Sequence, residues 1–127
     1  MAAVIIAAVS QAGRDEAMHL SYYRQYEEAN ARLEDRDFES AYETFKNLAP
    51  IYKNSYILHL KMAVCAMNLG LWEDAVGHSR RTLELRPALA KDEDFMHGLA
   101  YSFGEIGDTE AKDWIFDYYY NFAAMQK

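Results

Sequence analysis

The sequence predicts an all-α protein built from repeated helical hairpins, and three observations lead to this prediction. Apolar residues recur at steps of three and four, as in Phe38, Ala41 and Phe45, which places them on one face of an α-helix. Only two of the 127 residues are proline, while Ala, Leu, Glu and Met are abundant, and this composition favours helices. The third observation is a repeat, described next. Because no segment has a convincing period of two, we expect little or no sheet.

The repeat has a period of 34 residues and becomes visible when residues 22–53 are aligned with residues 56–87. Each unit reads as a helix, a tight turn, and a second helix that opens with an aromatic residue and carries a small residue three positions later. A third unit, residues 93–125, follows with looser spacing around the turn at Gly107. The matched pairs in the first two units are Ala29 and Ala63, Arg36 and Gly70, Phe38 and Trp72, and Ala41 and Ala75.

Helix boundaries follow from the turn chemistry. Asp37 is expected to cap the helix that begins at Phe38, and Asn54 or Ser55 the next helix. Gly70 suits a left-handed helix end, and Pro87 follows a helix that it cannot continue. We expect helices over residues 14–34, 37–52, 55–69, 72–85, 92–105 and 108–125, with residues 2–11 as a candidate additional helix.

The N-terminus stands apart from the repeats. Residues 2–9 read AAVIIAAV without a charge, which is far shorter than the roughly 20 residues that span a bilayer. The stretch also lacks the basic region of a secretory signal. We interpret residues 1–13 as an apolar segment packed on a domain of residues 14–127. In the alternative interpretation, residues 1–13 are the remnant of the anchor of a larger membrane protein.

Composition and charge narrow the class of partner. The net charge is −7 and no stretch is strongly basic, so we do not expect nucleic-acid binding. We expect no direct membrane insertion by residues 14–127. Cys65 is the single cysteine, so no internal disulfide is possible. The compartment is left open between a cytoplasmic protein and a membrane-associated soluble domain.

No residue pattern indicates a reaction centre, and we expect no enzyme, no cofactor and no metal. None of the four histidines is spaced three or four residues from another His or from Cys65, as zinc ligands on one helix would be. Cys65 lies in the most apolar helix and is interpreted as a core residue. An enzyme whose site is built from residues not grouped by spacing stays an alternative.

The repeat resembles the tetratricopeptide repeat (TPR). Residues 56–87 carry the resemblance through Ala63, Gly70, Trp72, Ala75 and Pro87. Residues 22–53 depart from the family pattern where Arg36 replaces the turn glycine and Lys53 the closing proline, and residues 93–125 match weakly. The resemblance implies a TPR-like right-handed α-solenoid of three antiparallel helical hairpins, with the N-terminal segment added.

In the resembled family, the first helix of each hairpin lines a concave surface that holds a peptide or a partner helix. Carried over to this chain, the resemblance implies a partner-binding groove that is apolar and rich in tyrosine. Its residues are Tyr23, Tyr26, Asn30 and Leu33 from the first unit, Ile57, Leu60, Lys61, Val64 and Met67 from the second, and Asp94, His97 and Tyr101 from the third. The family's chaperone-binding members hold a C-terminal carboxylate with a set of basic and amide side chains. Tyr26, Asp94 and Gly98 stand where basic groups of that set belong, so we do not expect such a clamp.

The function that these observations favour is protein–protein interaction, by a module or scaffold whose groove binds a peptide or partner helix. Three alternatives stay open. In the first, the chain is the soluble C-terminal assembly domain of a membrane protein. In the second, it is a structural domain that self-associates as a homodimer. In the third, the groove residues pack against the chain's own residues 2–11.

Overall fold

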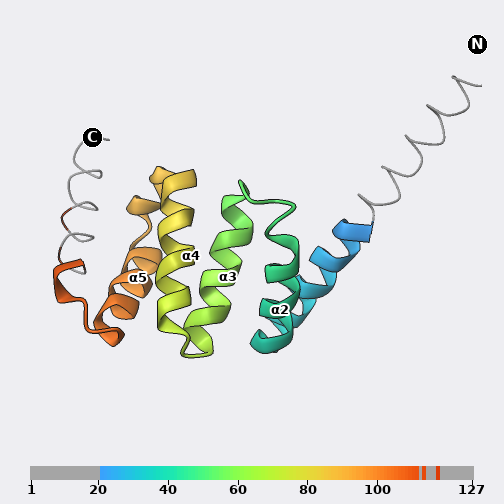
Figure 1. Cartoon of the computed structure of the whole chain (residues 1–127), viewed down its shortest axis with the longest axis horizontal. Coiled ribbons are helices and arrows are strands. Elements are labelled where there is room, and N and C mark those ends of the chain that lie inside the picture. The colour runs from blue at the N-terminus through green and yellow to red at the C-terminus, as the bar shows by residue number, and fades with distance from the viewer. Residues whose placement is uncertain (1–20, 112, 114–116, 118–127) are drawn as a thin grey trace, which may run out of the picture.

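The computed structural model describes residues 21–111, 113 and 117. These residues form helices and turns without a strand, which confirms the all-α prediction. Residues 21–34 are helical and are followed by α2 (Phe38–Leu48), α3 (Tyr56–Asn68), α4 (Trp72–Leu85), the 3-10 helix η1 (Pro87–Lys91) and α5 (Glu93–Glu105). Residues 109–111, 113 and 117 are again helical. From α2 to α5 the helices lie side by side in chain order, as a row of antiparallel hairpins (Figure 1).

The predicted helix over residues 37–52 is wrong at its end, because α2 stops at Leu48. Pro50 has no N–H to give to the helix and interrupts the ladder of hydrogen bonds. The chain then makes one more turn, in which the Tyr52 N–H donates to the Leu48 carbonyl at 3.1 Å. This turn brings Tyr52 back toward the first helix.

The other boundaries agree closely with the sequence. The helix expected over residues 72–85 is found with those bounds, and α3 and α5 begin within one residue of the expected positions. The 3-10 helix at Pro87–Lys91 was not predicted; Pro87 ends α4 but also opens this short helix, since proline is favoured at a first helical position. Three sequence predictions lie outside the described residues. They are the helix over residues 2–11, the helix start and domain boundary at residue 14, and much of the helix over residues 108–125.

The three hairpin turns share one backbone geometry. Arg36, Gly70 and Gly107 have φ values of 63°, 72° and 80°, in the left-handed region that helix ends often use. At each turn the next residue's N–H bonds back across the helix end in the Schellman pattern. These bonds are Asp37 to Arg32 at 2.8 Å, Leu71 to Ala66 at 2.9 Å, and Asp108 to Phe103 at 3.0 Å. Arg36 therefore takes the conformation of the glycine that it replaces.

Two clusters of buried side chains form the core. The first joins the helix over residues 21–34 to α2, α3 and the start of α4, and the second joins α4 to η1 and α5. The four small residues that the repeat places in register, Ala29, Ala41, Ala63 and Ala75, are all at most 1% exposed. A larger side chain at these positions would overpack the contact between neighbouring helices.

Candidate functional site

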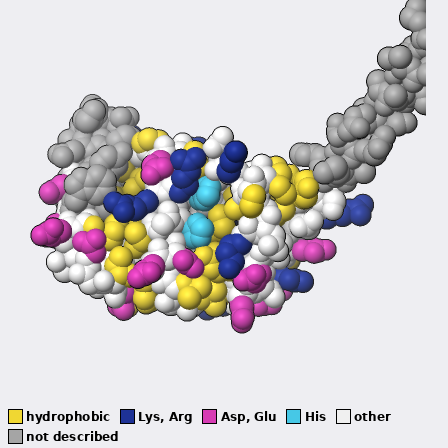
Figure 2. Space-filling view, viewed as in Figure 1, with side chains coloured by type: hydrophobic (Ala, Val, Ile, Leu, Met, Phe, Trp, Pro, Cys, Tyr) yellow, Lys and Arg dark blue, Asp and Glu magenta, His cyan; other side chains and the backbone are white. Residues whose placement is uncertain are grey.

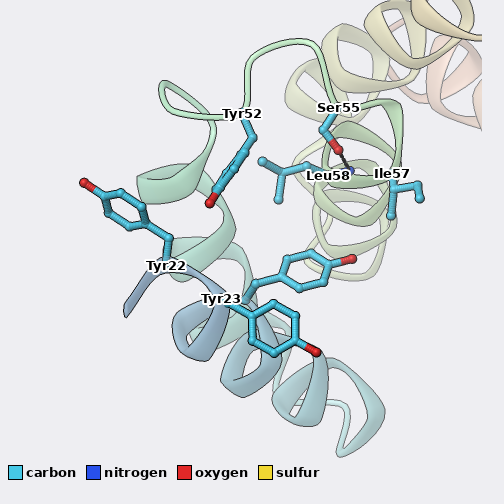
Figure 3. A pocket seen from close by; sticks show the side chains of 7 residues that line it. Tyr22, Tyr23, Tyr52, Ser55, Ile57 and Leu58 are labelled. Atoms are coloured by element: carbon cyan, nitrogen blue, oxygen red, sulfur yellow. Dashed lines mark hydrogen bonds between the residues drawn. The ribbon is translucent and has the colours of Figure 1, made fainter. Parts of the chain in front are cut away.

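The described part of the chain contains an apolar pocket of about 250 Å³ where the first helix faces the start of α3 (Figure 3). We call it the tyrosine pocket. Its lining residues are Tyr22, Tyr23, Tyr26, Tyr52, Ser55, Ile57 and Leu58. The polar atoms among them are tyrosine and serine hydroxyls together with the backbone, so the pocket is suited to an apolar group.

Ring contacts hold the wall of the pocket in place. Tyr22 and Tyr52 pack edge to face with their ring centroids 6.3 Å apart, although they are 30 residues apart in the sequence. Tyr26 packs its ring against the buried ring of Phe45 at 6.1 Å. Edge-to-face pairs of this kind restrict ring orientation, so the pocket is formed before any ligand arrives.

The start of α3 forms the opposite wall. Ser55 caps this helix by accepting a hydrogen bond from the Leu58 N–H at 3.3 Å, drawn as the dashed line in Figure 3. The cap fixes where the first turn of α3 begins. As a result Leu58 is buried beneath the pocket, while Ile57 stands at its rim with 40% of its surface exposed.

Large apolar side chains remain exposed around the pocket. Tyr23 is 56% exposed, and Val64, two turns beyond Ile57 on α3, is 38% exposed. A single exposed apolar residue is ordinary, but a group of them beside a preformed pocket marks an interaction surface.

Lys61 connects the two helices beside the pocket. Its Nζ donates to the Tyr26 hydroxyl at 2.8 Å and to the Asn30 Oδ1 at 2.5 Å. The same ammonium lies 4.7 Å from the centroid of the Tyr26 ring, where a cation is attracted by the face of the ring. We use the name groove for the tyrosine pocket together with Asn30, Lys61 and Val64.

Three predicted groove residues are partly buried and pack against the core. Leu33 and Met67 pack against the first core cluster. Leu60 is half-buried and packs against the second cluster. Met67 also lies against α5, where a Cβ on Gly98 would come within 3.1 Å of its sulfur. The lack of a side chain at Gly98 leaves the space that the end of the Met67 side chain occupies.

The predicted residues of the third unit are exposed on α5, apart from the tyrosine pocket. Asp94 and His97 belong to the outer surface of this helix. Tyr101 is 59% exposed and packs its ring on Trp72, with centroids 5.3 Å apart. A hydrogen bond to Glu105 raises the pKa of the Tyr101 hydroxyl. The structure therefore brings together Tyr23, Tyr26, Asn30, Ile57 and Lys61, and ties Tyr101 to α4 and its own helix.

Four pocket residues were missed by the sequence analysis: Tyr22, Tyr52, Ser55 and Leu58. The repeat pattern gives Ser55 only the role of a helix cap, and it assigns no part in the groove to Tyr22, Tyr52 or Leu58. The sequence does contain a signal for Tyr52. It stands just before the helix cap at Ser55, and a residue in that position lies beside the first turn of the next helix.

A polar cluster lies between α2, α3 and α4. The Tyr42 hydroxyl is 3.1 Å from the Asp74 Oδ2 and 3.0 Å from the His78 Nε2. The ring of His59 lies 6.1 Å from that of His78, although the two are 19 residues apart in the sequence. In the space-filling view of Figure 2, histidine side chains are visible near the middle of the face that is drawn. Spacing along one helix gave no sign of this pair.

The available donors and acceptors determine which group donates each hydrogen bond in this cluster. An ionised Asp74 only accepts, so it takes the single hydroxyl proton of Tyr42. The Tyr42 oxygen then accepts from His78, whose Nε2 must carry a proton. Burial and the neighbouring Asp74 raise the pKa of Tyr42, and burial followed by the repulsion of His59 lowers the pKa of His78. The cluster thus links α2 to α4 with His78 in its neutral form.

Cys65 sits at the centre of the first core cluster and is fully buried. Burial raises the pKa of its thiol to about 11. Since the thiolate is the reactive form, this environment is that of a packing residue.

Within residues 21–111, 113 and 117 no three His, Cys, Asp or Glu side chains are grouped as metal ligands. In the same residues no helix combines the length and apolarity that crossing a bilayer requires.

Comparisons with known proteins identify the architecture. No protein-family model matches this sequence, and no curated protein matches it. Among solved structures, a mutant of MamA superposes with a TM-score of 0.70 over 80% of this chain and 72% of that chain, at 16% sequence identity. MamA contains TPRs. The fold of this chain is a TPR-like α-solenoid. Identity this low shows the fold alone.

Proposed function

We propose that this protein is an interaction module that holds an apolar segment of a partner protein in the groove. The tyrosine pocket carries this proposal, because it is an apolar cavity of about 250 Å³ that opens beside the exposed side chains of Tyr23 and Ile57. The TPR-like fold adds support, since solenoids of stacked repeats create extended binding surfaces.

The pocket is suited to one large aliphatic or aromatic side chain of the partner. Burying such a side chain is worth about 1.5–3 kcal/mol, and the ring contacts of Tyr22 and Tyr26 mean that little ordering of the pocket is needed. The exposed surface of Tyr23, Ile57 and Val64 extends the contact along α3. The predicted placement of Tyr23, Tyr26 and Ile57 in the groove is kept in this proposal.

The described geometry favours the first hairpin and α3 over the third unit. Asp94, His97 and Tyr101 are proposed to contact only a partner long enough to extend from the pocket past α4. The proposal is compatible with a soluble assembly domain of a larger membrane protein, for which the same groove would hold another component.

A selection from a peptide library tests the proposal. A bead-bound library of N-acetylated dodecapeptides, linked to the bead through the C-terminus, is incubated with the fluorescently labelled full chain. Ile57→Asp places a charge at the rim of the pocket, and Ile106→Asp places the same charge at another exposed isoleucine, at the end of α5. Circular dichroism checks that both variants keep the helix content of the parent protein.

We expect the parent protein and Ile106→Asp to enrich the same apolar peptides, and Ile57→Asp to enrich none of them. Equal enrichment by Ile57→Asp would place binding outside the groove. Failure of the folded parent protein to enrich any peptide would refute the proposed function. In that case sedimentation equilibrium of the parent protein would show whether the apolar surface joins two copies.

A further inference from the structure

We propose that the groove selects partner segments that carry an Asp or Glu side chain about one helical turn from the apolar anchor, with Lys61 binding the carboxylate. This inference rests on the proposed function and specifies the partner's chemistry. It is carried by the position, hydrogen bonding and charge of Lys61.

Lys61 follows Ile57 by four residues on α3, and residues at this spacing lie on the same face of a helix. The rise of four residues is about 6 Å. A partner whose apolar side chain enters the tyrosine pocket beside Ile57 therefore passes the Lys61 ammonium one turn later. The matching spacing is three or four residues in a helical partner and two residues in an extended one.

The ammonium is held in a fixed position with hydrogen-bonding capacity to spare. A lysine has three N–H donors, and the bonds to Tyr26 and Asn30 use two of them. Both acceptors are neutral, so neither cancels the charge. Because Tyr26 also lines the pocket, its hydroxyl places the ammonium at the pocket's edge.

Lys61 lacks an acidic partner among the described residues, in which ion pairs join Lys46 to Glu43 and Arg81 to Glu84. Acidic residues outnumber basic ones by 20 to 13 in the chain, yet among the described residues none forms an ion pair with this half-buried cation. A partner laid over the groove would take further water from Lys61. Covering a charge without pairing it is costly, whereas a carboxylate would form a charge-assisted hydrogen bond. The groove thus penalises a purely apolar segment and favours an acidic one.

The bead selection tests this inference separately from the proposed function. Peptides enriched by the parent protein are sequenced, and we expect them to combine a large apolar residue with Asp or Glu at the spacings given above. The acetylated N-terminus and the bead linkage remove the terminal charges, so only a side-chain carboxylate can meet Lys61. Lys61→Met keeps most of the aliphatic stem and removes the charge, and Lys61→Arg keeps the charge.

The affinity of one enriched peptide then gives the decisive comparison. The peptide and its Glu→Gln (or Asp→Asn) analogue are measured by fluorescence anisotropy against the three proteins, each checked by circular dichroism. For the parent protein and Lys61→Arg we expect the acidic peptide to bind about 10-fold more tightly than its amide analogue, as a charge-assisted hydrogen bond implies. For Lys61→Met we expect the two peptides to bind equally, and for the parent we expect the preference to shrink as salt is added.

Three results would overturn the inference. If the enriched peptides are apolar without an excess of acidic residues, the groove binds segments but Lys61 does not select them, and the proposed function survives alone. If the acidic preference is as large with Lys61→Met as with the parent protein, another group binds the carboxylate. If no peptide is enriched by the folded parent protein, both the proposed function and this inference are wrong.

Discussion

Arg36 takes the left-handed backbone conformation that glycine takes at the two equivalent turns of this protein. For a residue with a Cβ, this conformation costs roughly 1–2 kcal/mol. We therefore expect Arg36→Gly to raise the free energy of unfolding by about 1 kcal/mol, with part of the gain offset by the greater freedom of glycine in the unfolded chain. Urea denaturation followed by circular dichroism measures the change.

Arg32→Gly is the matched control, because it makes the same substitution within the helix over residues 21–34. Glycine in a helix interior is destabilising by about 1 kcal/mol. The two variants are expected to change stability in opposite directions. A loss of stability in both would mean that the turn at Arg36 carries no backbone strain.

His78 makes the stability of the protein depend on pH. Burial and the nearby His59 lower its pKa in the folded protein below the usual value of 6.5, so the unfolded chain binds the proton more readily. The contribution of His78 is fully present above pH 6.5, and it is lost progressively as the pH falls below that value toward the folded pKa. We expect the free energy of unfolding to decrease on acidification in this range.

The variant His78→Gln tests that assignment through the slope of stability against pH. Urea denaturation is repeated between pH 7.5 and pH 5 for the parent protein and the variant, a range chosen to bracket the usual histidine pKa of about 6.5. The variant is expected to have the shallower slope, since it has lost a group that titrates differently in the two states. Parallel curves would show that other groups cause the dependence.

At the scale of the element, the starts of the helices differ in how they are capped. The side chains of Asp37, Ser55 and Asp92 each accept a hydrogen bond from the first turn of the helix that follows. Leu71, which begins α4, makes no such bond and is 42% exposed. In the second hairpin, α4 therefore lacks the side-chain cap that Asp37 gives to α2 in the first hairpin.

This difference predicts that Leu71→Ser is more stable than Leu71→Ala by about 1 kcal/mol, because a serine at this position accepts a hydrogen bond from the first turn. Both variants lose the same apolar contacts, so comparing them isolates the cap. Thermal unfolding followed by circular dichroism provides the measurement. Equal midpoints would show that α4 already begins in a way that a cap does not improve.

The helices also differ from the tyrosine pocket in how far they can be predicted from the sequence alone. Helix positions follow from local signals, such as the step of apolar residues in α4 and the Asp37 cap, so they are accessible without the structure. The end of α2 was missed because Pro50 breaks the helix while the apolar stripe continues to Tyr52. The tyrosine pocket depends on how this turn is placed against Tyr22, and a periodic pattern contains no such information.

At the scale of the whole molecule, α4 contributes to both core clusters and so joins the first hairpin to the third. The repeat register predicted this stacking, because the aligned alanines are buried at equivalent places. It did not predict that the polar cluster of Tyr42, Asp74 and His78 would bridge α2 and α4. Asp74 and His78 lie four residues apart on α4, but Tyr42 comes from the other repeat unit, and no local spacing connects it to them.

The same arrangement keeps the groove separate from the polar cluster. The groove lies between the helix over residues 21–34 and α3, where apolar side chains are exposed beside Lys61. In the polar cluster, Tyr42 is hydrogen-bonded to Asp74 and His78. The neighbouring His59 bonds to the Lys53 carbonyl through Nε2, and its buried Nδ1 has no partner among the described residues. Our account assigns partner binding to the groove and a structural role to the cluster.

Mapping amide chemical shifts in a ¹⁵N-labelled sample tests this central claim most directly. An end-capped synthetic copy of one enriched dodecapeptide is titrated into the full-length chain, and the perturbed amides are assigned. The account predicts that the largest changes lie in residues 22–33 and 55–64, with little change around Tyr42 and His78. A set of changes centred on Tyr42, Asp74 and His78 would contradict it and move the binding surface to the polar cluster.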